Sequence, residues 1–242
     1  MKKVLMIIPA YNEEGNILNT VNSIKNLKKE KEYVIDYVVI NDGSTDNTLK
    51  ILKDNNLNYI SLVRNLGIGG AVQTGYKYAY YKGYDIAIQF DGDGQHDANY
   101  IHDLIKEIDK GYNFVIGSRF ISNLSDFKST GSRRFGIKIL SGLIKIFTGK
   151  KIYDVTSGFR AGDKKIIKEF ASSYPLEYPE PETLAMLSKK GYKINEIPVK
   201  MLERKYGKSS INLTKSFYYM FSVSISIIIA SFKKGGKAWV IY

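Results

Sequence analysis

Five short runs of apolar residues recur along the first half of the chain, and polar residues separate them. The runs are rich in β-branched and aromatic residues, a composition typical of strands that are buried on both faces of a sheet. They cover residues 4–8, 38–40, 59–63, 86–90 and 114–116. The segments between them repeat apolar residues at helical intervals, and the clearest set is Ile101, Leu104, Ile105 and Ile108. The pattern therefore predicts strands and helices in alternation.

This alternation predicts an α/β fold, in which a Rossmann-like, mostly parallel central sheet has helices on both faces. Sheets of this kind bind ligands at the carboxyl ends of their strands. Each predicted strand is followed by a loop of polar and glycine residues, at 10–15, 41–47, 64–70, 91–97 and 117–120. We therefore expect the functional site where these loops converge.

The second half of the chain is less regular. A polar, basic stretch at 122–134 precedes a helical pattern at 135–147, and a proline-rich passage at 174–181 precedes a further predicted helix. No segment resembles a linker between domains, so we interpret residues 1–212 as one domain that carries the site.

Residues 213–242 form a C-terminal segment of a different character. Residues 217–232 are uncharged and mostly apolar, and as a helix these 16 residues span only about 24 Å, less than the ~30 Å hydrocarbon core of a bilayer. The apolar side chains that share one helical face are Phe217, Phe221, Ile225, Ile228 and Phe232. Lysines follow them, which favours an amphipathic helix at a membrane interface. The alternatives are a helix packed on the domain or in a homodimer, and a strand, which the alternation of apolar and serine residues at 221–227 also permits.

Composition excludes several classes of protein. The chain has 242 residues, of which 44% are hydrophobic and 25% charged, so it is too rich in core-forming residues to be disordered. It has no cysteine, which excludes a disulfide framework and a thiolate metal site. Two lysines precede the first apolar run, as in a signal peptide, but polar residues follow with no cleavage site. We therefore interpret this run as a buried strand of a cytoplasmic protein.

The formal net charge is +12. Such a surplus fits nucleic acid, an anionic membrane surface or a phosphorylated ligand, and charge alone does not choose among them. The lysines are spread along the whole chain, so a compositional bias accounts for the charge equally well. Together with the C-terminal segment, the charge leads us to expect a membrane surface, and no nucleic acid, as a partner.

The sequence Asp-Gly-Asp-Gly-Gln-His-Asp at 91–97 directly follows a predicted buried strand. Closely spaced carboxylates are hard oxygen ligands for Mg²⁺ or Mn²⁺, and such a site keeps positions open for substrate phosphates. Spacing excludes an EF-hand, because the sixth position is His96 rather than glycine and the twelfth is His102 rather than glutamate. A simple Asp/Gly turn is the remaining alternative. Asp91 and Asp93 are therefore candidate metal ligands.

Two further loops are less specific. Residues 41–48 fit a turn followed by an N-capped helix, yet their place at a strand end would let Asp42 accept hydrogen bonds from a base or ribose. The glycine-rich loop at 65–71 does not match the dinucleotide fingerprint, because Val72 stands where a third glycine is needed. The chain also contains no P-loop sequence.

Together these motifs resemble family 2 glycosyltransferases with the GT-A fold. The stretches that carry the resemblance are 9–14, 41–48, 64–75, 91–97, 117–120, 157–161 and 204–209. The likeness is greatest to the dolichol-phosphate mannosyltransferase branch and to bacterial relatives that make cell-surface polysaccharide. Two features depart from the family: Asn41 stands where a second aspartate is common, and the long multi-span membrane tail of some relatives is not seen.

The resemblance implies a role for each matching residue, in a family that uses a divalent cation (Mg²⁺ or Mn²⁺) and inverts the anomeric centre. Nucleotide-sugar binding falls to Pro9, Tyr11, Glu13, Asp42, Gly70, Asp91, Asp93 and Arg119. The implied metal ligands are Asp93, Asp91 and Gln95. Basic residues for phosphates of the donor or acceptor are Arg119, Arg133, Arg204 and Lys208. The planar guanidinium group suits a phosphate, although a solvated surface position is the alternative for each arginine.

Whether the reaction needs a general base depends on the acceptor. A sugar hydroxyl must lose a proton as it attacks, whereas a phosphate monoester, with a second pKa of about 6, is already largely ionised at pH 7. Glu180 resembles in position the catalytic carboxylate of hydroxyl-directed relatives, although an acid favoured at a helix start is the alternative. Asp154 is the second candidate base. We interpret His96 and His102, the only histidines, as a loop residue and a helix-face residue without catalytic roles.

We therefore expect an inverting, metal-dependent hexosyltransferase with a GT-A catalytic domain at 1–212. It would move a sugar from a UDP, GDP or dTDP donor to a lipid-linked or polysaccharide acceptor of the cell envelope, at the inner face of the membrane. The loop at 128–134 would close over the site. A polyprenyl-phosphate sugar synthase is the alternative within this class. A nucleotidyltransferase and a non-enzymatic basic module that binds membrane or nucleic acid are alternatives of other classes.

Overall fold

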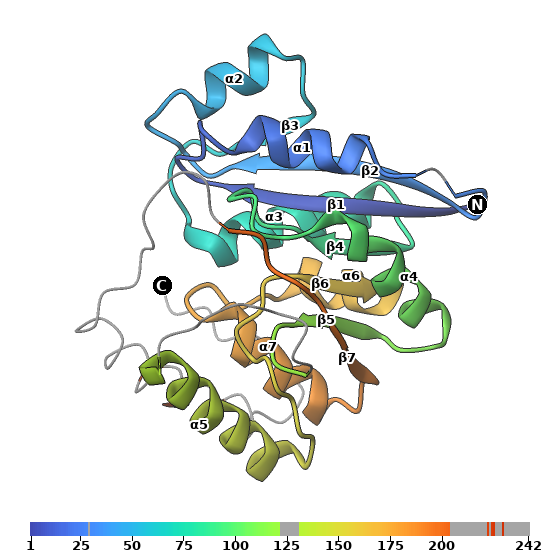
Figure 1. The fold of residues 1–242 in the computed structure, drawn as a ribbon, viewed down its shortest axis with the longest axis vertical. Coiled ribbons are helices and arrows are strands. Elements are labelled where there is room, and N and C mark those ends of the chain that lie inside the picture. Colours follow the sequence, from blue (N-terminus) through green and yellow to red (C-terminus); the bar gives the residue numbers. More distant parts are fainter. Residues whose placement is uncertain (29, 122–130, 204–221, 223, 226–228, 230–242) are drawn as a thin grey trace.

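A computed structural model describes residues 1–28, 30–121 and 131–203, together with residues 222, 224, 225 and 229 (Figure 1). Within these residues the chain forms one seven-stranded sheet flanked by helices. The strands are β1 (Lys2–Ala10), β2 (Tyr33–Asn41), β3 (Tyr59–Ser61), β4 (Ile86–Gln89), β5 (Phe114–Ser118), β6 (Arg160–Asp163) and β7 (Ile194–Pro198). The helices are α1 (Ile17–Lys25), α2 (Thr48–Asp54), α3 (Gly67–Tyr81), α4 (Ile101–Asp109), α5 (Gly131–Thr148), α6 (Lys164–Ser172) and α7 (Pro179–Lys189), with a short 3-10 helix η1 at Ala98–Tyr100.

The strands follow the order β3-β2-β1-β4-β6-β5-β7, and every neighbouring pair is parallel except the two pairs made by β6. β6 lies antiparallel between β4 and β5. Parallel neighbours require crossover connections, and helices supply them in the first half: α1 links β1 to β2, and α2 links β2 to β3. The predicted α/β fold with a mostly parallel sheet is confirmed.

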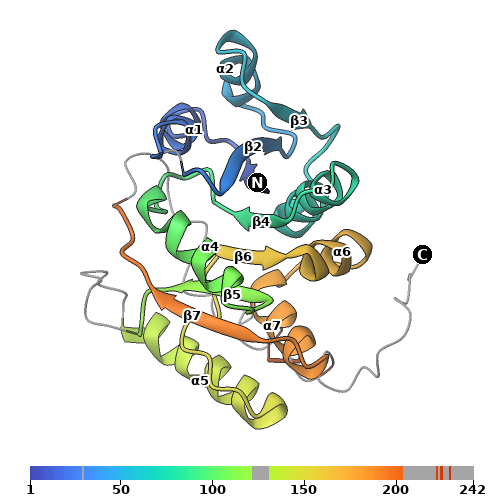
Figure 2. The same cartoon turned by 90° about the vertical axis from the view of Figure 1, so that its right-hand side faces the viewer.

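Two layers of helices cover the sheet (Figure 2). Successive side chains of a strand point to opposite faces, so Leu5 and Ile7 of β1 pack in one core while Met6 and Ile8 pack in the other. The first core contains apolar residues of α3, α5, α6 and α7, and the second contains those of α1, α2 and α4. The strands β1, β4 and β5 are therefore buried on both faces, which is why they have continuous apolar runs.

The five predicted strands all form, whereas the hydrophobic pattern does not predict β6 and β7. β6 has only four residues, Arg-Ala-Gly-Asp, and lacks a continuous apolar run. β7 is half-buried throughout and has polar residues at two of its five positions. Both strands are positioned by their neighbours in the sheet rather than by a local sequence signal.

The glycine-rich loop differs from its prediction, because α3 begins inside it at Gly67. Further along α3, Gly75 faces the central strand: a Cβ atom added there would lie 2.2 Å from Cγ2 of Ile7. The missing side chain allows α3 to pack directly on β1. One glycine of this region therefore serves helix packing.

Most of the C-terminal segment lies outside the described residues. Of its members, Ser222, Ser224, Ile225 and Ile229 are helical. The division into a domain at 1–212 and an interfacial segment at 213–242 stays a prediction. Within the described part of the chain, no helix has both the length and the apolar character that a membrane span requires.

Candidate active site

The carboxyl ends of the parallel strands meet at one edge of the sheet, on the left in Figure 1. Backbone hydrogen bonds join the loops that follow them: the Asp42 N–H donates to the Ala10 carbonyl over 2.9 Å, and the Gly92 N–H donates to the Pro9 carbonyl over 3.2 Å. The loops after β2 and β4 are therefore both bound to the carboxyl end of β1. This confirms the predicted convergence of strand-end loops.

The acidic loop after β4 carries two partly exposed carboxylates. Asp91 is 32% exposed, and its Oδ1 accepts a hydrogen bond of 3.0 Å from Nε2 of Gln89. Oδ1 of Asp93 accepts one of 3.0 Å from the backbone N–H of Gln95. Gly94, between Asp93 and Gln95, has a φ of +74°, in the region that favours glycine. The turn therefore holds both carboxylates at the strand end.

The chain passes close to this loop from the direction of β6. A Cβ atom added to Gly158 would lie only 2.4 Å from Oδ2 of Asp91, so no larger residue fits against the carboxylate without displacing it. A Cβ on Gly92 would lie 2.9 Å from the Pro9 carbonyl. Both glycines therefore permit the close packing that orients Asp91.

The loops after β1 and β2 are bound to each other. The Asn12 side chain accepts a 2.8 Å hydrogen bond from the Thr45 N–H, and the Glu13 N–H donates to Oγ1 of Thr48 over 2.9 Å. Tyr11 in this loop is exposed, and Glu13 is half-buried. These two candidate nucleoside-binding residues thus lie beside the end of β2.

Asp42 and Gly70 connect the end of β2 with the start of α3. The Asp42 side chain is buried, and its Oδ1 accepts a 2.7 Å hydrogen bond from the Leu66 N–H. Gly70 is buried in the first turn of α3. The structure therefore brings Pro9, Tyr11, Glu13, Asp42, Gly70, Asp91 and Asp93 to one edge.

Arg119 and Asp154 form a buried ion pair, with exposures of 5% and 0%. The guanidinium donates two hydrogen bonds of 2.7 Å, from Nε to Oδ2 and from Nη2 to Oδ1, and Nη2 also donates to Oγ1 of Thr156 over 2.8 Å. Burial alone would raise the pKa of Asp154, but the hydrogen bonds and charge of Arg119 outweigh burial, and this pKa lies below its usual value.

This ion pair bears on two of the expected roles, and both stay predictions. Nε and Nη2 of Arg119 already bind Asp154, so a phosphate would have to compete with this carboxylate for the guanidinium group. Asp154 is a poor base, because it has no exposed surface and its anionic form is stabilised. Glu196 of β7, which the sequence pattern does not single out, supports this pair: its carboxylate accepts hydrogen bonds from the N–H groups of Tyr153 and Asp154 over 2.7 and 2.9 Å.

Glu180 lies in the first turn of α7, which begins at Pro179 as the sequence predicts. The residue is half-buried. Burial raises the pKa of its carboxyl; the positive charge of Arg160 opposes this, and the negative charge of Asp91 adds to it. Glu180 therefore lies within electrostatic range of Asp91, on the side of the site that α7 forms.

Arg160 holds the first turn of α7 in place through hydrogen bonds. Its side chain is fully buried, and Nη1 donates to the Glu180 carbonyl over 2.8 Å and to Oγ1 of Thr183 over 2.9 Å. Further bonds reach the carbonyls of Val155 and Ser157. One buried cation thus links the start of β6 to the start of α7.

His96 is the site residue that sequence reasoning undervalued. It is a loop residue as expected, but it is buried, and its Nδ1 accepts a 3.1 Å hydrogen bond from the Asp91 N–H. In the sequence, its position one residue after Gln95 in the acidic loop was the signal that could have indicated a role in the site. His102 lies in α4, as expected for a helix residue.

The donor set at this edge suits a hard divalent cation. The carboxylates of Asp91 and Asp93 and the amide of Gln95 are oxygen donors of the kind that Mg²⁺ and Mn²⁺ prefer. Among the described residues, no cluster of three or more histidine, cysteine or acidic side chains could enclose a metal ion. A cation here would keep several positions for water and phosphate oxygens, as Mg²⁺ commonly does.

Three of the predicted basic residues lie beyond what the structure describes. Arg204 and Lys208 are outside the described residues. Arg133 falls within α5, but its side chain is not among those described. The predicted closing loop at 128–134 begins outside the described residues as well.

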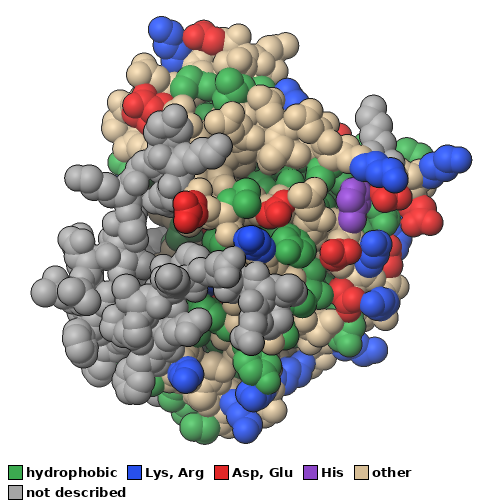
Figure 3. All heavy atoms as spheres, in the orientation of Figure 1, with side chains coloured by type: hydrophobic (Ala, Val, Ile, Leu, Met, Phe, Trp, Pro, Cys, Tyr) green, Lys and Arg blue, Asp and Glu red, His purple; other side chains and the backbone are tan. Residues whose placement is uncertain are grey.

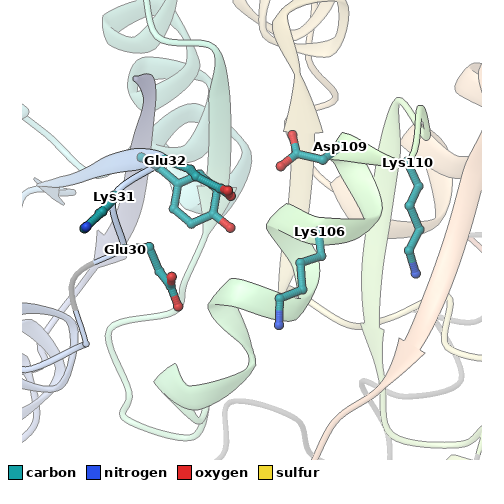
Figure 4. Close-up of a pocket in the computed structure, with 7 residues that line it drawn as sticks. Glu30, Lys31, Glu32, Lys106, Asp109 and Lys110 are labelled. Atoms are coloured by element: carbon teal, nitrogen blue, oxygen red, sulfur yellow. The ribbon is translucent and has the colours of Figure 1, made fainter.

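One hollow adjoins this site, and a larger one lies away from it. A cavity of about 360 Å³ lies between α1 and the acidic loop, with Asn16, Thr20 and Asp93 among its lining residues. A larger hollow of about 680 Å³ lies at the opposite, amino ends of β1 and β2 (Figure 4). Acidic and basic side chains alternate around that hollow, and Figure 3 shows such mixed charges at the right-hand end of the molecule.

Comparison with known proteins identifies the class. The model of the family described as "Glycosyl transferase family 2" matches residues 6–171, so the chain belongs to glycosyl transferase family 2. The resemblance inferred from the motifs is confirmed. Membership also decides for a glycosyltransferase against the nucleotidyltransferase and the non-enzymatic binding module.

Relatives align over nearly the whole chain. UDP-N-acetylglucosamine–dolichyl-phosphate N-acetylglucosaminyltransferase of Methanococcus voltae is 34% identical, over 85% of this chain and 88% of its own. Polyprenol monophosphomannose synthase of Mycolicibacterium smegmatis is 23% identical, over 92% of this chain and 86% of its own. Both belong to the polyprenyl-phosphate branch to which the motifs point.

A solved structure has the same fold. Glucosyl-3-phosphoglycerate synthase from Mycobacterium tuberculosis, in complex with Mn²⁺, UDP-glucose and phosphoglyceric acid, superposes with a TM-score of 0.71. The alignment covers 97% of this chain and 82% of that chain, at 16% identity. The GT-A fold expected from the motifs is confirmed.

Proposed function

We propose that this glycosyltransferase moves a sugar, with inversion, from a nucleotide-diphosphate donor to a polyprenyl-phosphate acceptor in cell-envelope glycan synthesis. The observation that carries the donor half is the pair of partly exposed carboxylates, Asp91 and Asp93, held at the strand edge beside Asp42. The acceptor half is supported by the relative that is 34% identical, whose name specifies dolichyl phosphate, and by the polyprenol monophosphomannose synthase.

Asp93, Asp91 and Gln95 would hold Mg²⁺ or Mn²⁺, and the bound ion would neutralise charge on the departing diphosphate. The chain's own residues position the donor. Asp42 would accept hydrogen bonds from the base or ribose, with Tyr11 and Glu13 beside it. The donor would be a UDP, GDP or dTDP sugar, and the name of the relative from Methanococcus voltae favours UDP-N-acetylglucosamine.

In this proposal, basic residues other than Arg119 contact the phosphates. Arg133, Arg204 and Lys208 would bind the phosphates of the donor or of the lipid, because arginine offers a planar fork and lysine a point charge. Arg119 is not among them, since it is bound to Asp154. Its role is to hold the loop that leads into β6.

A hydroxyl acceptor on a lipid-linked or polysaccharide glycan is the second candidate, and one observation favours it. Glu180 is half-buried with a raised pKa and lies within electrostatic range of Asp91, as a general base for a hydroxyl should. A phosphate acceptor needs no such base because it is already ionised. The extent to which transfer activity depends on Glu180 therefore distinguishes the two acceptor classes.

The C-terminal segment would bring the site to the inner membrane surface, where the lipid acceptor lies. A short apolar helix followed by lysines is attracted to anionic lipid headgroups. We expect deletion of residues 213–242 to abolish sedimentation with anionic vesicles. Unchanged sedimentation would contradict this part of the proposal, and a loss of dimers in the deleted protein would favour the homodimer instead.

One assay tests the whole proposal. The full chain, with Mn²⁺ and vesicles, is offered UDP-N-acetylglucosamine, UDP-glucose, GDP-mannose or dTDP-glucose, with undecaprenyl phosphate or undecaprenyl-diphosphate-linked N-acetylglucosamine as acceptor. We expect one donor to yield a polyprenyl-phosphate sugar and free nucleoside diphosphate. Release of nucleoside monophosphate would contradict the proposal. So would the absence of sugar transfer to both acceptors.

The variant Glu180→Gln completes that assay. With a phosphate acceptor we expect activity within about threefold of wild type, because no base is required. With a hydroxyl acceptor we expect a loss of about 10²- to 10⁴-fold, the usual contribution of a general base. A large loss with undecaprenyl phosphate would show that the carboxylate is needed for another reason, such as holding the donor sugar.

A further inference from the structure

The acidic loop contains a histidine whose environment is unusual for a loop. His96 is only 3% exposed, although it lies three residues after Asp93 in a loop at the edge of the sheet. Its backbone pairs with Met201 in an isolated antiparallel bridge, and the next hydrogen bond runs from the Leu202 N–H to the Gln95 carbonyl over 2.8 Å. The loop is therefore anchored from outside as well as from β4.

Both ring nitrogens of His96 face Asp91. Nδ1 accepts a hydrogen bond of 3.1 Å from the backbone N–H of Asp91. A neutral ring that accepts at Nδ1 carries its proton on Nε2, and Nε2 lies 3.6 Å from Oδ2 of Asp91. The same ring therefore contacts the peptide group and approaches the carboxylate of one residue.

Aromatic packing fixes the plane of this ring. His96 stacks on Phe159 with ring centroids 4.9 Å apart and 15° between the planes, and it meets Phe90 edge-on at 5.4 Å. Phe159 directly follows Gly158, where an added Cβ atom would lie 2.4 Å from Oδ2 of Asp91. The ring, the carboxylate and the start of β6 thus form one packed unit, and the ring cannot turn without breaking it.

The other histidine offers a comparison within the same chain. Nε2 of His102 lies 3.1 Å from the Lys28 carbonyl, and its Nδ1 is buried with no hydrogen-bond partner among the described residues. The ring of His102 therefore contacts the connection between α1 and β2. Only His96 joins its ring to a candidate metal ligand.

We propose that His96 is a positioning residue: its Nδ1 holds the Asp91 peptide, and thereby the Asp91 carboxylate, in the orientation that receives the metal–diphosphate group of the donor. The inference rests on the proposed function, since it assumes that Asp91 and Asp93 bind that group. Partners of this kind that orient a metal-binding carboxylate change metal affinity by about 10- to 100-fold when removed.

Four variants separate the hydrogen bond from the packing. His96→Phe keeps a ring against Phe159 but removes the acceptor. His96→Asn places an amide oxygen near the position of Nδ1, and His96→Gln places it near that of Nε2. His102→Phe is the matched control, because it removes the other histidine of the chain.

The first measurement is the affinity of the full chain for Mn²⁺, followed by electron paramagnetic resonance, with UDP and with GDP. We expect His96→Phe and His96→Gln to bind Mn²⁺ about 10- to 100-fold more weakly than wild type. His96→Asn should stay within about fivefold, and His102→Phe should not change. Equal binding by the Asn and Gln variants would overturn the inference, even if the Phe variant does not fold.

A second measurement needs no metal. The Asp91 amide should exchange with deuterium slowly in wild type and in His96→Asn, and at least tenfold faster in His96→Gln and His96→Phe, because a buried hydrogen bond protects it. If wild type bound neither nucleotide with Mn²⁺, the proposed function would fail while exchange would still test His96. Unchanged exchange in both variants would overturn the role of His96.

Discussion

The two sides of this site use charge in different ways. On the side of β1, β2 and β4, carboxylates are held by neutral groups: Asp42 by a backbone N–H, and Asp91 by the amide of Gln89. On the side of β5 and β6, charged side chains are bound by other groups inside the protein. Arg119 is paired with Asp154, and Arg160 is surrounded by buried oxygen acceptors.

The difference teaches which charges are available for ligands. A carboxylate oriented by neutral donors keeps its negative charge for a cation, whereas a buried arginine paired with a carboxylate has already satisfied its charge. In the proposed function the acidic side would therefore bind the ligand, and the arginine side would hold the binding residues in place. The following predictions test this division, from the largest expected effect to the smallest.

The largest effect should come from breaking the ion pair. Asp154→Asn leaves the Arg119 guanidinium buried and uncompensated, so we expect a loss of about 3–5 kcal/mol in the free energy of unfolding, measured by urea denaturation. Replacing both residues, by Arg119→Met and Asp154→Leu, should restore much of this loss. Asp85→Asn, which breaks an exposed pair with Lys164, should cost no more than about 1 kcal/mol. A double variant as unstable as Asp154→Asn would contradict the division.

The second effect should separate binding from stability. Asp93→Asn should lower sugar transfer by at least about 100-fold, because in the proposed function its charge would hold the metal, which would contribute several kcal/mol to the transition state. The free energy of unfolding without ligand should stay within about 0.5 kcal/mol. Asp97→Asn is the control in the same loop: its amide oxygen still accepts the bond from the Asn99 N–H, so both stability and transfer should change little. The reverse pattern would assign binding to Asp97.

The third effect concerns the contact between the two sides. Gly158→Ala places a Cβ 2.4 Å from Oδ2 of Asp91, so the carboxylate must shift. We expect Mn²⁺ binding with nucleotide to weaken by about tenfold, which corresponds to about 1.4 kcal/mol. Gly142→Ala, in α5 with no atom within 4 Å of the added Cβ, should instead stabilise the protein by up to about 1 kcal/mol. Unchanged metal binding in Gly158→Ala would show that Asp91 does not need its packed orientation.

The smallest effect should appear on acidification. Because the pKa of Asp154 is below its ordinary value of 3.8, the stability from its ion pair is fully present above that value. As the pH falls further, the unfolded chain binds the proton first, and the stability is lost as the pH passes through the folded pKa. The free energy of unfolding, measured with urea, should therefore fall more steeply between pH 6 and pH 3 for wild type than for Asp154→Asn. Parallel curves would contradict the ionised pair.

Much of the binding side was predictable from sequence because it follows local patterns. Buried parallel strands have continuous apolar runs, and the polar residues directly after them must meet at one edge. The placement of Asp42, Asp91 and Asp93 at this edge was therefore predictable from their positions along the chain. The start of α7 at Pro179 was predictable for a similar reason, since proline favours the first turn of a helix.

The arginine side was not predictable in this way. Arg119 and Asp154 are 35 residues apart, and nothing in either local sequence distinguishes an arginine that binds phosphate from one that binds a carboxylate. The role of His96 was missed for the same reason: its stacking partner, Phe159, lies far along the chain and becomes a neighbour only when β6 enters the sheet.

The sequence by itself determined the alternation of strands and helices, the edge where the site forms, the acidic loop and the family. These features depend on the periodicity of nearby residues and on motif order, which are visible along the chain. Only the tertiary structure decided which charges pair and which face the site. That decision depends on β6, a four-residue strand with no apolar run, lying antiparallel between β4 and β5. Its position brings Gly158, Phe159 and Arg160 against residues that are distant in sequence, and contacts of this kind have no local signature.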